Sequence, residues 1–158
     1  MTFSNPLIAV ADLDRSKAFY KEVLGLSVIL DFGANVTLEG GLSLQTLDTW
    51  QDFLGTDQIT FFSRSSELYF VEEEFDRFLQ ALSRFDIRYV HPLKEHRWGQ
   101  RVVRFYDPDG HIIEVGESLA AVCRRFLAQG LTPEEIALRM DIPLSHVAEL
   151  LAQYPLES

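Results

Sequence analysis

The feature that most constrains the fold of this sequence is a pattern that occurs twice. Residues 6–10 form a short apolar run typical of a strand, and Asp12 then provides an N-cap acceptor for an amphipathic helix that ends at Gly25. The same plan restarts 62 residues later, with a strand over 68–71, an acidic cap at Glu74 and a second amphipathic helix. At this offset the caps and the buried helical positions of the two copies coincide. The pattern therefore predicts an internal duplication of a β-α-β unit.

Each predicted helix is followed by short β-rich segments. In the first copy these segments cover residues 26–32, 36–38 and 42–47. In the second copy they cover residues 87–90, 101–106 and 111–115, the last two joined by the turn Asp107-Pro108-Asp109-Gly110. Beyond Ser118 the apolar spacing becomes wholly helical, and Thr132 opens one of these helices with a capping box. The chain is thus predicted to be two similar units followed by C-terminal helices.

Composition limits the classes of function. The 158-residue chain is 47% hydrophobic, as expected of a folded globular protein, and its net charge of −10 repels nucleic-acid phosphates. Cys123 is the single cysteine, so an intrachain disulfide and a cysteine-based zinc cluster are excluded. The N-terminus has no basic segment followed by an apolar stretch, and no apolar run approaches the length of a membrane span. A cytoplasmic protein with no membrane partner is expected.

Four segments together carry a family resemblance. They are residues 10–16 (Val-Ala-Asp-Leu-Asp-Arg-Ser), Phe19-Tyr20, Leu24-Gly25-Leu26 and residues 105–114 (Phe-Tyr-Asp-Pro-Asp-Gly-His-Ile-Ile-Glu). In this order and spacing the chain resembles the vicinal oxygen chelate superfamily, which includes glyoxalase I, bleomycin-resistance proteins and extradiol dioxygenases. The resemblance implies an α+β fold in which paired βαβββ modules form a cup-shaped curled sheet.

The resemblance also implies a domain division. The vicinal-oxygen-chelate domain is expected over residues 1–118, with module one at about 5–60 and module two at about 66–118. Residues 119–158 are expected to form a helical extension. Members of this superfamily often form dimers, some by exchanging modules, so a homodimer is expected.

Strand alternation selects four polar residues for the inside of the cup. If the apolar faces pack under the helices, Asn5, Gln45, Glu67 and Glu114 all point into it. The resemblance implies that these are the positions of the family's metal ligands. Glyoxalase-like enzymes usually have His or Gln, Glu, His and Glu there, so only Glu114 is preserved. Since no histidine falls on these positions, the His-His-Glu iron site of the dioxygenases is excluded.

The chemistry of these four side chains predicts two forms of the site. A set of two carboxylates and two carboxamides suits Mg²⁺, Mn²⁺ or Ca²⁺ better than Zn²⁺ or Ni²⁺. Without a cation, Glu67 and Glu114 would be like charges in a partly apolar cavity, where one holds its proton near neutral pH. Such a pair suits proton transfer on a carbon next to a carbonyl. In either form Glu67 and Glu114 are the predicted catalytic residues.

Residues 91–101 form the predicted wall of the pocket. Trp98 offers a flat apolar face, and His96 and Arg101 offer hydrogen bonds to an anionic or carbonyl ligand. Trp50, in the linker between the modules, is a further candidate for substrate binding. The alternative for both regions is a solvated loop anchored by one tryptophan.

Three classes of function remain open from the sequence. The first is a lyase or isomerase of glyoxalase type acting on a small carbonyl compound or thioester, with or without a divalent cation. The second is a metal-free protein that binds and sequesters a small molecule, as bleomycin-resistance proteins do. The third is a ligand-sensing regulator, because residues 132–150 resemble a helix-turn-helix motif. Residues 119–158 hold three basic and five acidic residues, which disfavours nucleic acid as a partner.

Overall fold

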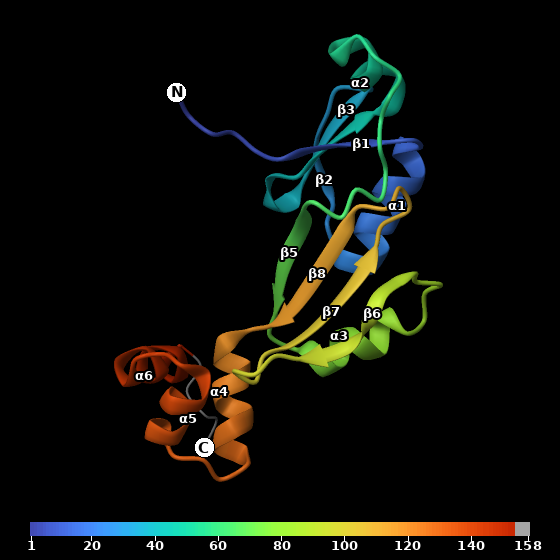
Figure 1. Cartoon of the computed structure of the whole chain (residues 1–158). Coiled ribbons are helices and arrows are strands. Elements are labelled where there is room, and N and C mark those ends of the chain that lie inside the picture. The colour runs from blue at the N-terminus through green and yellow to red at the C-terminus, as the bar shows by residue number, and fades with distance from the viewer. Residues whose placement is uncertain (154–158) are drawn as a thin grey trace. The chain divides into compact units, whose positions relative to one another are not determined.

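The computed structural model describes residues 1–153 and divides into two compact units (Figure 1). The first consists of Met1–Ser66 with Tyr106–Ile112, and the second of Glu67–Phe105 with Ile113–Ser158. Each unit carries a four-stranded sheet, neither sheet closes into a barrel, and helices follow at the C-terminal end of the chain. The α+β fold class expected from the sequence is therefore confirmed. Within the described residues no helix is long and apolar enough to cross a membrane.

The first unit contains one sheet and two helices. Its elements are β1 (Leu7–Val10), α1 (Leu13–Leu24), β2 (Val28–Asp31), β3 (Asn35–Leu38), a short 3₁₀ turn (Glu39–Gly41), β4 (Ser43–Thr46) and α2 (Leu47–Leu54). The strands lie in the order β1-β4-β3-β2, with β1 parallel to β4 and the other pairs antiparallel. The long connection from β1 to β4, which includes α1, permits this parallel pairing, since two parallel neighbours cannot be joined by a hairpin.

Helix α1 begins and ends where its capping residues predict. The Asp12 side chain accepts a hydrogen bond from the Arg15 backbone N–H at 2.9 Å, and Gly25 adopts the left-handed conformation with φ 73°. The helix buries Ser16 and Tyr20, and the core of this unit is completed by apolar strand residues such as Val10 and Leu44.

The second unit repeats the sheet. Its strands are β5 (Glu67–Glu72), β6 (Tyr89–Glu95), β7 (Arg101–Tyr106) and β8 (Ile112–Glu117), with α3 (Phe75–Leu82) between the first two. The order β5-β8-β7-β6 matches that of the first sheet position by position. The turn that joins β7 to β8 is counted with the first unit, where the Tyr20 hydroxyl donates to Asp107 and Arg15 pairs with Asp109.

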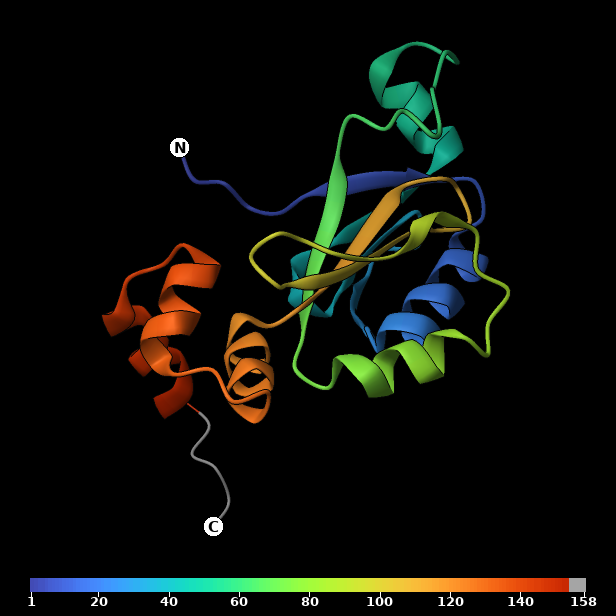
Figure 2. The ribbon, with the colours of Figure 1, turned by 60° about the horizontal axis from the view of Figure 1, so that its bottom comes forward.

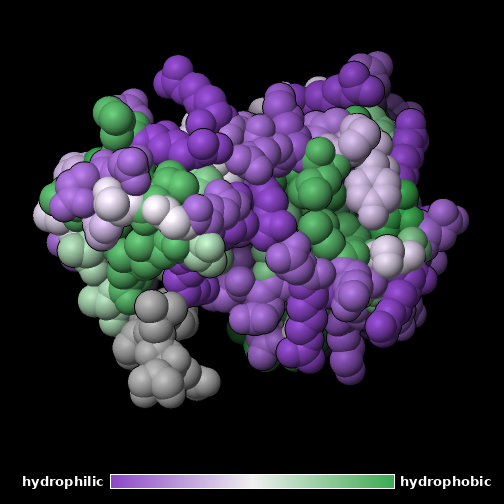
Figure 3. Space-filling model, turned by 90° about the horizontal axis from the view of Figure 1, so that it is seen from below, coloured by the Kyte–Doolittle hydropathy of each residue, from purple (hydrophilic) through white to green (hydrophobic). Residues whose placement is uncertain are grey.

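Three helices complete the second unit: α4 (Leu119–Ala128), α5 (Pro133–Met140) and α6 (Leu144–Ala152). They lie against one another (Figure 2) around a core that includes Val122, Phe126, Ile136 and Val147. The predicted capping box is present, because Thr132 and Glu135 each accept a hydrogen bond from the other's backbone N–H. Figure 3 shows hydrophobic side chains at the surface of this helical region as well.

Two elements differ from the sequence-based expectation. Helix α2 occupies a segment expected to be a linker, and its N-cap residue, Thr46, makes no side-chain cap bond. Strand β6 continues to Glu95, although the loop was expected to start at residue 91. Pro92 does not prevent this, because β6 is an edge strand, where a missing backbone donor costs no ladder hydrogen bond.

Candidate functional site

Arg104 brings the two predicted acids of the second unit together. Its Nε donates to the Glu67 carboxylate at 2.9 Å, and its Nη2 forms an ion pair with the Glu114 carboxylate. The three side chains come from β5, β7 and β8, which are neighbours in the sheet. The Glu114 side chain is 7% exposed and that of Glu67 is 38% exposed. The Arg104 guanidinium therefore lies between the two carboxylates that the sequence predicts to be catalytic.

Glu67, Arg104 and Glu114 form a charged row, and two histidines lie near its arginine. The His91 ring nitrogen Nδ1 lies 2.7 Å from the Pro92 carbonyl oxygen, which can only accept, so Nδ1 carries the proton. Its Nε2 is then the acceptor facing Arg104 Nη1 at 3.4 Å. The pKa of His96 lies below its usual value because of burial, with further lowering by the positive charges of Arg104 and Lys94. The His96 imidazole is therefore neutral near pH 7.

The predicted pocket wall is present in part. The rings of His96 and Trp98 stack at 4.3 Å with an interplanar angle of 14°. The Trp98 indole N–H donates to the Gln100 side-chain oxygen at 3.2 Å, and the Gln100 amide donates to the Tyr69 hydroxyl at 3.1 Å. Tyr69 lies two residues after Glu67 on β5, so the two side chains share one face of the sheet.

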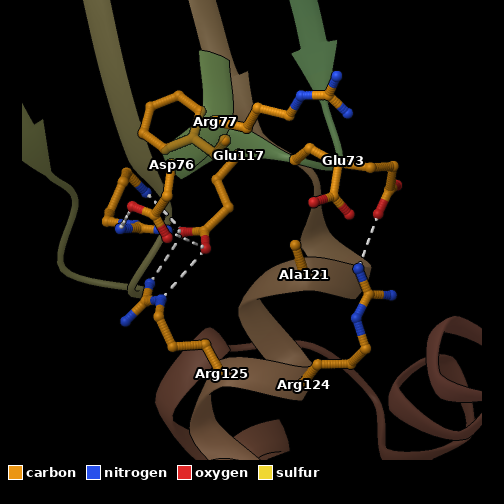
Figure 4. Close-up of a pocket in the computed structure, with 10 residues that line it drawn as sticks. Glu73, Asp76, Arg77, Glu117, Ala121, Arg124 and Arg125 are labelled. Atoms are coloured by element: carbon orange, nitrogen blue, oxygen red, sulfur yellow. Dashed lines mark hydrogen bonds and ion pairs between the residues drawn. The ribbon is translucent and has the colours of Figure 1, made fainter. Parts of the chain in front are cut away.

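Arg101 belongs to a different cluster from His96 and Trp98. Its guanidinium donates to the carboxylates of Asp76 and Glu117, at 2.7 and 2.9 Å for the shortest contacts (Figure 4). Arg125 of α4 donates to the same Glu117 carboxylate at 3.0 Å. Burial raises the pKa of Glu117, but the hydrogen bonds from Arg101 and Arg125 outweigh it, and the net shift is downward. This arrangement fastens α4 to the end of β8.

A cavity of about 300 Å³ lies beside this cluster. On its other side Arg124 pairs with Glu73 at 2.9 Å, and Ala121 lies between the two ion-pair groups in the close-up (Figure 4). Four arginines and four acidic residues line the cavity, namely Arg77, Arg101, Arg124, Arg125, Glu73, Glu74, Asp76 and Glu117. The opposite charges balance, so the lining favours neither an anion nor a cation.

The other two predicted ligands lie in the first unit, on β4 and just before β1. The Asn5 amide donates to the Ser43 hydroxyl at 2.7 Å. The Gln45 side-chain oxygen accepts from the Asn35 amide at 2.9 Å, and its nitrogen donates to the Thr49 hydroxyl. Trp50 is half-buried on α2 of the same unit. Asn5 and Gln45 therefore belong to two separate hydrogen-bonded groups, and the amide oxygen of Gln45 already has a donor.

The donor set does not fit a divalent cation as the described residues stand. Both carboxylates are paired with Arg104, and a guanidinium within contact of them repels a second positive charge. The best-placed amide oxygen, that of Gln45, is engaged with Asn35. Among residues 1–153 no cluster of three or more His, Cys, Asp or Glu side chains is arranged to hold a metal ion.

The sequence-based prediction missed Arg104, His91, Tyr69 and Gln100. The signal for Arg104 was present, because it is a lone charge inside the apolar strand Val-Val-Arg-Phe-Tyr at residues 102–106. Charged side chains are rarely placed in such a strand unless they are paired. Gln100 gave no comparable signal, since it lies in a polar loop sequence.

Comparisons with known proteins agree on one family. The model of the glyoxalase-like domain matches residues 3–120. A solved structure of a protein of unknown function from Agrobacterium tumefaciens str. C58 is 41% identical, with a TM-score of 0.66, and the alignment covers 75% of this chain and 95% of that one. No curated protein matches the chain.

Two more distant solved structures share the fold. A lactoylglutathione lyase from Agrobacterium tumefaciens is 24% identical with a TM-score of 0.58, covering 74% of this chain and 93% of that one. A glyoxalase/bleomycin resistance protein/dioxygenase from Nocardioides is 21% identical with a TM-score of 0.57, covering 75% and 84%.

Proposed function

Because the chain belongs to the glyoxalase-like domain family, we propose that it binds a small molecule on the polar face of its second sheet, without a divalent cation. The face is defined by Glu67, Arg104 and Glu114 together with Tyr69. The observation that carries the proposal is the position of Arg104, whose guanidinium holds the two carboxylates that would otherwise be free to bind a metal. Of the alternatives left open by the sequence, this is the metal-free binding protein of bleomycin-resistance type.

The charges of the face indicate what kind of molecule it accepts. Two carboxylates and one guanidinium leave a formal charge of −1, on a chain whose net charge is −10. An anionic ligand is therefore repelled both locally and at long range. Small binding sites use a few oriented polar groups beside an apolar surface, and the stacked His96 and Trp98 rings supply the latter.

Calorimetric metal titration tests the proposal. We expect no binding of Mg²⁺, Mn²⁺, Ni²⁺ or Zn²⁺ to the wild-type protein at millimolar concentration. Arg104→Gln frees both carboxylates and should create weak binding of Mn²⁺, which Arg104→Gln combined with Glu114→Gln should abolish. Arg104→Lys, which keeps the positive charge, is the matched control and should behave like the wild type. Stoichiometric metal binding by the wild-type protein would refute the metal-free proposal.

A lyase or isomerase of glyoxalase type is the second candidate. The specific observation in its favour is that the buried Glu114 carboxylate and the His96 imidazole, whose pKa is lowered, both lie near Arg104, since such groups serve as general bases. The name of the structurally similar lactoylglutathione lyase suggests a direct assay, which is the conversion of lactoylglutathione. Turnover that Glu114→Gln reduces by about two orders of magnitude or more would establish this candidate.

Homodimer formation remains a prediction from the family resemblance. Sedimentation equilibrium on the full chain would measure it directly. A mass near the 18.1 kDa of one chain would contradict it.

A further inference from the structure

Three side chains of the second unit form a hydrogen-bonded chain that ends at the Tyr69 hydroxyl. The Trp98 indole N–H donates to the Gln100 side-chain oxygen, and the Gln100 amide nitrogen donates to the Tyr69 oxygen at 3.1 Å. The same nitrogen also donates to the Glu117 backbone carbonyl at 2.9 Å. Gln100 is 8% exposed, so the chain is anchored in the interior, whereas Tyr69 is 52% exposed.

The direction of every hydrogen bond in this chain is fixed by chemistry. An indole N–H can only donate and a backbone carbonyl can only accept, so Trp98 and Glu117 each independently set which end of the Gln100 amide is oxygen and which is nitrogen. Both amide hydrogens are then used, one on Glu117 and one on Tyr69. The Tyr69 oxygen is consequently an acceptor, and its own O–H has to point elsewhere.

Within the described part of the chain no group accepts a hydrogen bond from that O–H. Gly116 on β8 lets the Tyr69 hydroxyl and the Gln100 amide approach the strand closely, because a Cβ there would lie 3.1 Å from both the hydroxyl oxygen and the amide nitrogen. Glu67 lies two residues before Tyr69 and Glu114 two residues before Gly116, so the hydroxyl borders the charged row.

We propose that Tyr69 is the specificity-determining donor of this face and that its hydroxyl binds the oxygen of a neutral carbonyl compound. The inference rests on the proposed binding function and adds the class of ligand. A carbonyl oxygen is an acceptor only, which matches a hydroxyl whose acceptor side is taken by Gln100. The net negative charge of the neighbouring row selects a neutral carbonyl compound over a carboxylate.

A matched pair of probes separates carbonyl recognition from apolar binding. Acetophenone and α-methylstyrene have nearly the same shape, but only the ketone has an acceptor oxygen. We expect the wild-type protein to bind acetophenone about three- to tenfold more tightly, the range expected of one neutral hydrogen bond. Titrations followed by two-dimensional ¹H–¹⁵N NMR would report on the Trp98 indole and Gln100 side-chain N–H signals.

Variants assign the preference to the hydroxyl and to its orientation. Tyr69→Phe should bring the affinity ratio of the two probes to about one, and Gln100→Met should reduce it while leaving Tyr69 in place. Tyr89→Phe, at an exposed tyrosine of β6 outside the hydrogen-bonded chain, is the matched control and should keep the wild-type ratio.

Three outcomes would overturn the inference: equal affinity of the wild-type protein for both probes, an unchanged ratio in Tyr69→Phe, or no binding of acetophenone up to its solubility limit. Equal affinity for the two probes would leave the binding function intact and remove only the carbonyl assignment. Failure of both probes to bind would count against the proposed binding function itself, whereas the metal titration tests only its metal-free part.

Discussion

Asp107 shows how a single residue can organise more of the structure than its sequence context indicates. The sequence around it predicts a tight turn, and the turn is present, with the Asp109 and His111 backbone N–H groups donating to its Oδ1. Its Oδ2 accepts from the Tyr20 hydroxyl of α1 and lies 2.9 Å from the His111 ring. The partnership with Tyr20 could not be predicted, because it joins residues 87 positions apart in the sequence and depends on the fold.

Tyr20→Phe tests this buried partnership through alkaline pH. Burial raises the pKa of Tyr20 well above its usual value, and the Asp107 charge raises it further. In the unfolded chain the phenol ionises near pH 10, whereas in the folded chain it stays protonated, so the wild-type stability falls as pH rises above about 10. Tyr20→Phe should cost about 1.5–3 kcal/mol at pH 7, because it removes a hydrogen bond to a charged group. The variant should also lose less free energy of unfolding than the wild type as pH rises above about 10.

Urea denaturation at pH 7, 9, 10 and 11 would measure both effects. Phe19→Leu, at the neighbouring and less buried helix position, is the control for loss of aromatic packing and should keep the alkaline slope. A Tyr20→Phe variant that loses stability above pH 10 as steeply as the wild type would contradict the assignment to this phenol.

The candidate site could be predicted from the sequence only in part, for a physical reason. Strand alternation predicted a common face for Glu67 and Glu114, because the side-chain period of a strand is fixed, and in the structure both carboxylates contact Arg104. It could not pair them with Arg104, since that contact depends on which strands are neighbours, and strand order is a property of the fold. Arg101 was predicted to line the same pocket. It lies three residues before Arg104 on β7, and an odd offset places its side chain on the opposite face, where it contacts Glu117.

Glu117→Gln tests how much the cluster of Arg101, Asp76, Glu117 and Arg125 stabilises the fold. The Glu117 side chain is 2% exposed and holds both Arg101 and Arg125, so neutralising it leaves two guanidinium groups without that charge. We expect a loss of about 3–5 kcal/mol at pH 7. Since the pKa of Glu117 is lowered by folding, its contribution is present above about pH 4.5 and fades as pH falls further. The variant should therefore show a shallower acid transition than the wild type in thermal melts from pH 7 to 3, and Glu74→Gln should not.

At the scale of elements, helices with explicit capping chemistry were predicted well. Asp12, Gly25 and Thr132 mark helix ends that the structure confirms. Helix α2 was missed because its eight residues give a hydrophobic pattern too short to stand out from a linker, whereas the apolar pattern that begins with α3 continues to Phe85 in the sequence. Strand β6 was cut short because His-Pro at residues 91–92 and Lys-Glu at residues 94–95 resemble loop chemistry, which an edge strand tolerates.

Thr132→Ala tests whether the capping box sets the stability of α5. Removing the side-chain acceptor of the Glu135 N–H should cost about 1 kcal/mol. Because α5 packs in the helical core through Ile136 and Met140, the loss should appear as faster hydrogen exchange of the amides of α5 and α6. Ser145→Ala, an exposed substitution in α6 without a cap role, should leave those rates unchanged. Equal exchange rates in Thr132→Ala and the wild type would contradict the role of the cap.

At the scale of the whole molecule, the duplication predicts that the two sheets share one topology, which no single element indicates by itself. The two sheets have the same strand order, although their residues differ at most positions, because each copy must bury one apolar face under its own helix. The family match ends at residue 120, so α5 and α6 lie outside it. They belong to the segment whose sequence resembles a helix-turn-helix, and Asp141 lies in the left-handed conformation at the turn between them.

The charge of α6 determines whether these helices can bind DNA. The exposed positions of α6 are Leu144, Ser145, Ala148, Glu149 and Ala152, none of which is basic. A recognition helix without Lys or Arg has no group to neutralise phosphates, and Glu149 adds repulsion. We therefore predict no binding of duplex DNA by the wild-type protein, even at about 50 mM salt, where nonspecific electrostatic binding is strong.

Fluorescence anisotropy of a labelled 30-base-pair duplex would measure this, with a charge-reversed protein as the internal control. Ser145→Lys, Ala148→Lys and Glu149→Lys combined change only exposed positions of α6 and add three positive charges while removing one negative charge. If charge alone separates this extension from a DNA-binding one, the triple variant should gain binding that weakens steeply between about 50 and 200 mM salt. Binding by the wild-type protein would restore the regulator hypothesis. A triple variant as inert as the wild type would mean that the extension lacks the geometry of a DNA-binding motif as well as the charge.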